Sequence, residues 1–177
     1  MLPVPPLPAA AARHGAELVK IHAFLYHIGL RLEQKALGDD CFLPGLELGP
    51  GVVYVDYDKL CWPGDILHEA GHLAVTPASQ RAAVGSAALE LPWPTQGEEI
   101  GALLWSYAAL RHLDLTPEYV FHADGYKGDA GWLAEQFCSG NYIGMPILEW
   151  AGLSLSPERA QAEGKPAFPQ MLQWLRD

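Results

Sequence analysis

The sequence is poor in basic residues and in long apolar runs, and each shortage excludes a class of protein. Eleven Lys and Arg stand against 21 Asp and Glu, which gives a formal net charge of −10. A chain of this charge is repelled by nucleic-acid phosphates and by anionic lipid headgroups. No apolar run approaches the roughly 20 residues that a membrane-spanning helix requires. We therefore expect neither a nucleic acid nor a membrane as a partner.

Cysteine is also scarce, with only Cys41, Cys61 and Cys138 in the chain. They form no CxxC pair, and an odd number fits poorly with a disulfide framework. We expect reduced, mostly buried thiols, as in a cytoplasmic protein. The start of the chain has no basic residue before its apolar stretch, and its prolines are incompatible with the apolar core of a signal peptide. The sequence therefore favours a cytoplasmic location.

The composition that remains is that of a folded domain. Half of the 177 residues are apolar, which predicts a packed core rather than disorder. Residues 1–9 are rich in proline and are expected to form a flexible arm. Residues 10–177 contain neither an internal repeat nor a long linker, so we expect a single domain there. Its fold class is α+β, mostly helical with a small β-sheet.

The first half of the chain changes from a helical to a strand pattern. Apolar residues recur at steps of three and four over residues 10–37, which predicts an amphipathic helix. Residues 52–57 are β-branched or aromatic and predict a strand, which could pair with residues 46–48 as a hairpin. A second, weaker strand is expected over residues 87–91.

Later segments carry start and stop signals of helices. Asp65 can cap a helix over residues 66–75, which ends at Thr76 because Pro77 follows. Thr95 introduces a strongly apolar helix that continues to about Leu113. Shorter helices are expected to begin near Thr116, Asp129, Pro146, Pro157 and Pro169.

The segment His68-Glu69-Ala70-Gly71-His72 lies inside the helix expected over residues 66–75. Two histidines four residues apart project from one helix face, so both imidazoles can reach a single zinc ion. Glu69 is rotated by about 100° from His68, too far to be an equivalent ligand. Its carboxylate can instead take a proton from a water on the ion. The alternative is an ordinary buried helix whose histidines are satisfied within the core.

This HExxH segment resembles the signature of the zincin metallopeptidases. The resemblance covers the motif, the preceding strand and the next helix, about a third of the chain. It implies a zincin-like domain with a catalytic Zn²⁺ and with Glu69 as general base and general acid. It also implies a peptide or small amide substrate that lies along the sheet edge, for which residues 52–57 are the candidate strand.

A catalytic zinc site usually has a third protein ligand, and Glu98 and Glu99 are the candidates. They resemble the gluzincin branch, in which a glutamate on a following helix completes the site. Thr95-Gln96-Gly97-Glu98 matches a capping box, which would occupy Glu98. Glu99 then enters a buried helix and needs a partner, so we expect His68, His72 and Glu99 as the ligands, with Glu98 as the fallback. Both glutamates could instead merely favour the positive end of the helix dipole.

A Gly-rich loop over residues 121–128 carries His122 and Tyr126. Gluzincins often use a His or Tyr outside the metal motif to stabilise a developing oxyanion, so the resemblance implies that role for these two side chains. An Asp-Gly turn with exposed neighbours is the simpler alternative.

Together these patterns predict a zinc-dependent hydrolase, either a peptidase or an amidase. The competing hypothesis is a non-catalytic zincin-like scaffold that binds a metal, or a regulatory or interaction protein. A third is a metal-free helical protein in which the motif is accidental.

Overall fold

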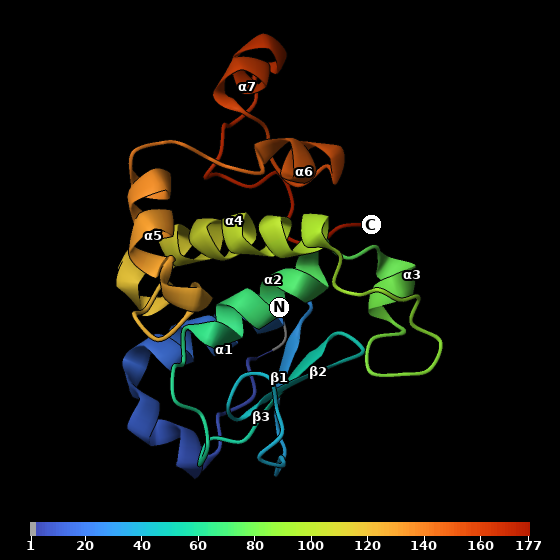
Figure 1. Cartoon of the computed structure of the whole chain (residues 1–177), viewed down its shortest axis with the longest axis vertical. Coiled ribbons are helices and arrows are strands. Elements are labelled where there is room, and N and C mark those ends of the chain that lie inside the picture. Colours follow the sequence, from blue (N-terminus) through green and yellow to red (C-terminus); the bar gives the residue numbers. More distant parts are fainter. Residues whose placement is uncertain (1–2) are drawn as a thin grey trace.

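The computed structural model describes residues 3–177 and consists of helices stacked on one side of a three-stranded sheet (Figure 1). The elements follow one another as η1 (Ala9–His14), α1 (Gly15–Ile28), β1 (Arg31–Gln34), β2 (Leu46–Gly49), β3 (Val52–Val55), α2 (Asp65–Val75), α3 (Ala78–Arg81), α4 (Gln96–His112), η2 (Pro117–Tyr119), η3 (Tyr126–Gly128), α5 (Ala130–Cys138), α6 (Met145–Trp150) and α7 (Pro157–Glu163). The predicted α+β class with a dominance of helix is confirmed.

The elements are stacked in layers, with α2 between the sheet and α4 (Figure 1). Helix α4 crosses the middle of the molecule, and α6 and α7 lie on its far side. The core fills the space between these layers with fully buried side chains such as Leu67, Leu73, Leu104 and Trp105. Burial of this apolar surface is the main term that holds α2 and α4 in place.

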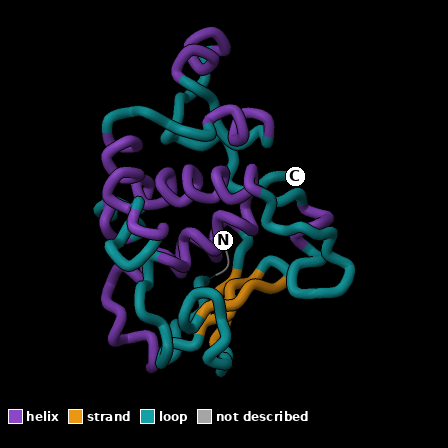
Figure 2. The backbone as a smooth tube through the Cα atoms, in the orientation of Figure 1, coloured by secondary structure: helices purple, strands orange, loops and turns teal. Residues whose placement is uncertain are grey.

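The strands form one small sheet in the order β1-β3-β2 (Figure 2). Strand β3 is parallel to β1 and antiparallel to β2, and the β2–β3 hairpin confirms the pairing that was expected. The expectation that residues 52–57 offer a free edge is wrong. Residues 31–34 form β1 and occupy one side of β3, so β2 is the exposed edge strand on the other side.

The single helix predicted over residues 10–37 is also wrong in its second half. Helix α1 ends at Ile28 because Gly29 adopts a left-handed conformation with φ of 94°, which a glycine takes at little cost. The Gly29 amide bonds back to the helix, and the chain then leaves it as β1. Residues 31–34 contain a single apolar residue, Leu32, whose spacing from Ile28 also fits a helix, so nothing local marked them as a strand.

The expected strand at residues 87–91 is absent, and the chain there forms turns. Pro92 and Pro94 follow directly, and proline cannot donate to a strand ladder. No helix begins at Pro169 either, because the Phe168 and Leu172 amides bond to Leu155 and Leu153. Helices near the other expected starts are confirmed at η2, α5, α6 and α7.

The three cysteines are free, but they are not mostly buried as expected: Cys61 and Cys138 are exposed and Cys41 is half-buried.

Of the expected arm, residues 1–2 lie outside the described residues, and the Pro5 carbonyl oxygen lies 2.8 Å from His22 Nε2. The division into an arm and one domain stays a prediction. Within residues 3–177, none of the helices has the length and apolarity to cross a membrane.

Candidate metal centre

The centre depends on an unusually close approach of α2 to α4. Gly71 lies against α4, and a Cβ atom at this position would stand 2.8 Å from the Ala102 carbonyl oxygen. That distance is too short for any side chain, so only glycine allows the two helices to pack this closely. The close packing brings the start of α4 next to the histidine face of α2.

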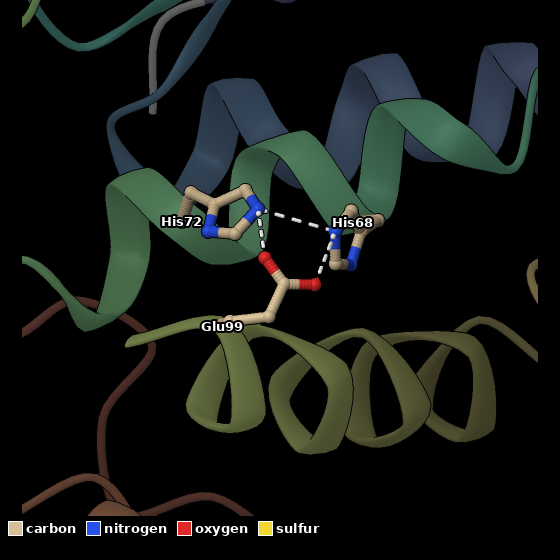
Figure 3. Close-up of side chains that lie close together, drawn as sticks. All are labelled: His68, His72 and Glu99. Carbon is tan, nitrogen blue, oxygen red and sulfur yellow. Dashed lines mark hydrogen bonds and ion pairs between the residues drawn. The ribbon is translucent and has the colours of Figure 1, made fainter. Parts of the chain in front are cut away.

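Three side chains converge in the space between these helices (Figure 3). The Nε2 atoms of His68 and His72 lie 3.1 Å apart. Glu99, at the start of α4, places its two carboxylate oxygens 3.4 Å from His68 Nε2 and 3.3 Å from His72 Nε2. A tetrahedral zinc ion with ligand bonds of about 2.0–2.1 Å has donors about 3.3–3.4 Å apart. Each histidine nitrogen lies at about this spacing from one of the two carboxylate oxygens, and one ligand atom from each residue lies within 4.8 Å of the others, so the group could hold one ion.

The protonation states of the cluster also suit a cation. Burial lowers the pKa of His72 well below its usual value, and the neighbouring His68 lowers it further, so the imidazole is neutral. A hydrogen bond with His68 lowers the pKa of Glu99, so the carboxylate is ionised. Metal binding needs a neutral imidazole and a charged carboxylate. His72 and Glu99 are therefore in their ligand forms at neutral pH.

Glu98 and Glu99 have different tasks, as the capping box suggested. Glu98 Oε2 accepts hydrogen bonds from the Thr95 amide at 2.7 Å and from the Thr95 hydroxyl at 2.8 Å. The Thr95 hydroxyl in turn accepts from the Glu98 amide. These bonds turn the Glu98 carboxylate back to the helix start, and Glu99 alone of the pair reaches the histidines.

Glu69 lies beside the cluster without belonging to it, as its rotation on the helix predicted. It borders a cavity together with His72 and Glu99. Burial raises the pKa of Glu69 to about 7, against a smaller opposing effect of His68. A carboxyl group with a pKa near neutrality is suited to accept and return a proton.

Asp65 does not cap α2, which corrects the expectation from the sequence. Its side chain makes no capping bond, and Oδ1 lies 2.9 Å from Nε2 of His122 instead. Both side chains are buried, and the Trp62 ring stacks on the imidazole at 4.3 Å between centroids. A buried charge needs such a partner, so His122 displaces the backbone amides. His122 Nδ1 has no hydrogen-bond partner among residues 3–177.

Tyr126 stands over the cluster from the loop that follows η2. Its ring meets His68 edge-on at 5.6 Å between centroids. The hydroxyl is buried and has no hydrogen-bond partner within the described part of the chain. Burial raises the pKa of Tyr126 above its usual value, and Asp65, Glu99 and Glu69 raise it further. The phenol is therefore protonated and lies close to all three carboxylates.

Two cavities open on either side of the cluster, and Phe42, Leu43 and Glu99 line both. The first, which we term the aromatic cavity, has a volume of about 520 Å³ and is lined by Phe42, Leu43, Pro44, Cys61, Trp62, Asp65, His68, Glu99, His122, Asp124, Gly125, Tyr126 and Lys127. The second, the edge-strand cavity, measures about 610 Å³ and includes residues 46–48 of β2, Asp40, Glu69, His72 and Trp93. The cluster thus lies at the centre of a two-part cleft.

Two residues that line this cleft, Phe42 and Lys127, were not predicted as site residues from the sequence. Phe42 belongs to a loop without any recognisable motif, and nothing in the sequence marks it. Lys127 stands next to Tyr126 in a pair of left-handed residues, with φ of 54° and 56°. The dense glycines at Gly125 and Gly128 were the available signal of an unusual backbone.

Comparison with known proteins adds no family to this geometry. No protein-family model, no curated protein and no solved structure matches the chain. The resemblance to the gluzincins therefore rests on the HExxH segment and on the position of Glu99. What stands on the structure alone is a His68–His72–Glu99 cluster able to hold a metal ion.

Proposed function

We propose that this protein is a zinc-dependent hydrolase of peptides or small amides, of the gluzincin type. The observation that carries the proposal is the convergence of His68, His72 and Glu99 at distances of 3.1–3.4 Å between donor atoms. Two imidazoles and one carboxylate leave the fourth position of a tetrahedral ion free, which is the arrangement of catalytic rather than structural zinc.

The surrounding side chains have the properties that amide hydrolysis needs. A bound zinc ion would polarise the carbonyl and lower the pKa of a water molecule to about 7. Glu69, with its pKa raised to about 7 by burial, accepts the proton from the attacking water and passes it to the leaving nitrogen. Tyr126 donates its unpartnered hydroxyl to the oxygen that gains negative charge.

His122 receives a different role from the one that the resemblance implied. Its Nε2 is engaged by the buried carboxylate of Asp65, which holds the imidazole in place rather than leaving it free for a substrate oxygen. We assign it to positioning: the Asp65–His122 pair ties the loop of Tyr126 to the start of α2. The stacked Trp62 holds the imidazole ring in this orientation.

An extended substrate fits the cleft along β2. This strand is the sheet edge beside the cluster, and its residues 46–48 line the edge-strand cavity. Unpaired backbone groups of an edge strand can bind a peptide as an additional strand. A chain bound in this way would bring an amide bond over the metal centre between the two cavities.

The test combines metal analysis with a single substitution. Protein purified without a histidine tag should contain one zinc ion per chain and cleave members of a peptide library. The Glu69→Gln variant should keep its zinc and lose hydrolysis by about 10²–10⁴-fold, the usual contribution of a general base. Zinc-loaded wild-type protein that cleaves no peptide or amide would contradict the proposal.

A non-catalytic metal-binding scaffold is the second candidate, and one observation favours it. The Nδ1 atoms of His68 and His72 are buried and have no hydrogen-bond partner within residues 3–177. Histidines that ligate a catalytic metal almost always donate this second ring N–H to an orienting partner. On this reading zinc binds and raises the melting temperature, while the Glu69→Gln substitution changes neither the metal content nor any turnover.

A further inference from the structure

The two cavities of the cleft differ in their charge. Acidic side chains line both: Asp65, Glu99 and Asp124 in the aromatic cavity, and Asp40, Glu47, Glu69 and Glu99 in the edge-strand cavity. Among the described residues that line either cavity, Lys127 is the single Lys or Arg, and it belongs to the aromatic cavity. One point of the cleft is therefore suited to a negative group, in a protein whose net charge is −10.

Lys127 has no partner of its own. Within residues 3–177 its side chain makes neither a hydrogen bond nor an ion pair, although Asp124 lines the same cavity. By contrast, Lys35 is ion-paired with Glu47 at the opposite end of the cleft. Lys127 lines the same cavity as His68 and Glu99 of the cluster.

The backbone that carries Lys127 is strained. Tyr126 and Lys127 are consecutive residues in the left-handed region, with φ of 56° and 54°. Side chains other than glycine, Asn and Asp rarely adopt this conformation, and strain of this kind is concentrated at functional sites. The two residues together place a phenol over His68 and an ammonium group at the same cavity.

The rest of the aromatic cavity is suited to a large apolar group. Trp62 and Phe42 are 40% and 95% exposed, and both line this cavity. Its volume of about 520 Å³ falls within the usual range of small-molecule sites, about 300–1,000 Å³. Exposed aromatic side chains gathered at a cavity indicate a surface that is covered when a ligand binds.

We propose that the aromatic cavity and Lys127 together bind the C-terminal residue of the substrate, so that the enzyme acts as a carboxypeptidase for bulky apolar residues. Lys127 binds the free α-carboxylate, and Trp62 and Phe42 contact the side chain. Water adds across the last amide bond: the acyl carbon gains the hydroxyl, and the leaving nitrogen gains a proton. The products are a shortened peptide and a free apolar amino acid. The inference rests on the proposed hydrolase function for its chemistry, but the binding claim is separable from it.

Kinetics with a matched pair of substrates tests the preference for a free carboxylate. N-acetyl-alanyl-phenylalanine should be cleaved by the zinc-loaded protein about 10- to 100-fold better in kcat/KM than its C-terminal amide, as expected for a bond to a charged group. The Lys127→Met variant should reduce this ratio to near one, and Lys127→Arg should retain most of it. Lys20→Met, which removes the same charge from α1, should leave the ratio unchanged. Equal cleavage of acid and amide by the wild type would overturn the inference and leave the hydrolase proposal standing.

Calorimetry on the zinc-loaded Glu69→Gln variant measures binding without turnover. The acid should bind about 10- to 100-fold more tightly than the amide. Adding Lys127→Met to this variant should remove the difference. If the acid is preferred through Lys127 although no peptide is hydrolysed by the wild type, the carboxylate site stands and the hydrolase proposal fails. If acid and amide bind equally in the presence of Lys127, the carboxylate site is refuted.

Discussion

The two sides of the cleft are built in different ways. On one side, His68, Glu69, His72 and Glu99 project from two helices that are packed together at Gly71. On the other side, Tyr126 and Lys127 come from an irregular loop with left-handed residues, which is tied down by the His122–Asp65 contact. The candidate metal ligands thus lie on regular elements, and the groups proposed to contact the substrate lie on a loop.

The helix side of the cleft has to be rigid, whereas the loop side can vary. Metal ligands must be held within a few tenths of an ångström, and packed helices supply that precision. Loops on a rigid scaffold commonly carry the residues that select a substrate. Changes on the helix side should therefore affect metal binding and stability, whereas changes on the loop side should affect turnover and substrate preference.

The largest effect should come from the third ligand. Replacing Glu99→Gln removes the charged donor and should weaken zinc binding about 10²–10³-fold, because a four-ligand structural zinc site binds with about 10–16 kcal/mol in total, or about 2.5–4 kcal/mol for each ligand. Glu98→Gln is the matched control, since glutamine can still complete the capping box. Competition with a zinc chelator measures both affinities. If both variants lose zinc affinity to the same extent, Glu99 is not a ligand of the ion.

The same contrast explains how much could be predicted from sequence. The α2 and α4 helices, the capping box and the shared face of the two histidines follow from local rules of spacing and capping, whereas the choice of Glu99 also used the resemblance to the gluzincins. Each of these rules acts within a turn or two of helix. The candidate metal ligands could therefore be predicted from the sequence once the helices were assigned.

The rest required contacts between distant segments. Residues 31–34 become a strand only because they pair with β3, and this pairing makes β2 the edge beside the cleft. Asp65 was predicted to cap the helix because its real partner, His122, is 57 residues further along the chain. Rules that consider only neighbouring residues cannot identify such a contact. Phe42 borders the cleft through a loop conformation that no sequence pattern specifies, and the flanking glycines indicate an unusual backbone at Lys127 but not its position in the cleft.

Glu69 offers a test of the helix side through its pH dependence in the metal-free protein. Its pKa is raised from 4.5 to about 7 by burial, so the folded state favours the protonated form. The contribution of Glu69 to stability should fall by roughly 3 kcal/mol as the pH rises from about 4.5 to about 7, because one pKa unit corresponds to about 1.4 kcal/mol. The lowered pKa of His72 acts in the opposite direction below about pH 6.5 in both proteins, so the difference between the wild type and the Glu69→Gln variant isolates the Glu69 contribution. Urea unfolding of both proteins at pH 4.5 and pH 8 measures the difference. Identical pH profiles would show that Glu69 is solvated and unsuited to act as a base.

Tyr126 provides the corresponding test of the loop side. Tyr126→Phe removes a hydroxyl that no described residue uses, and it should lower kcat by about 10²-fold, as for the loss of one oxyanion donor. Zinc affinity should not change, because the metal donors are on the helices. Tyr57→Phe is the control, since it removes another buried hydroxyl without a partner, away from both cavities. A Tyr126→Phe enzyme with full kcat would remove the phenol from the proposed mechanism.

The smallest change tests whether helix packing sets the metal geometry. Gly71→Ala adds one methyl group, which would meet the Ala102 carbonyl oxygen at 2.8 Å and push α4 away from α2. We expect a loss of about 1–3 kcal/mol, the usual cost of overpacking, together with weaker zinc binding as Glu99 moves from the histidines. Gly131→Ala in α5 meets nothing within 4 Å and should be neutral or slightly stabilising, because alanine favours a helix over glycine. Thermal unfolding with and without zinc compares the two variants. If Gly71→Ala loses stability but keeps its zinc affinity, the three side chains adjust to the ion by their own motion. The helix side of the cleft would then be less rigid than the packing at Gly71 indicates, and its contrast with the loop side would be weaker.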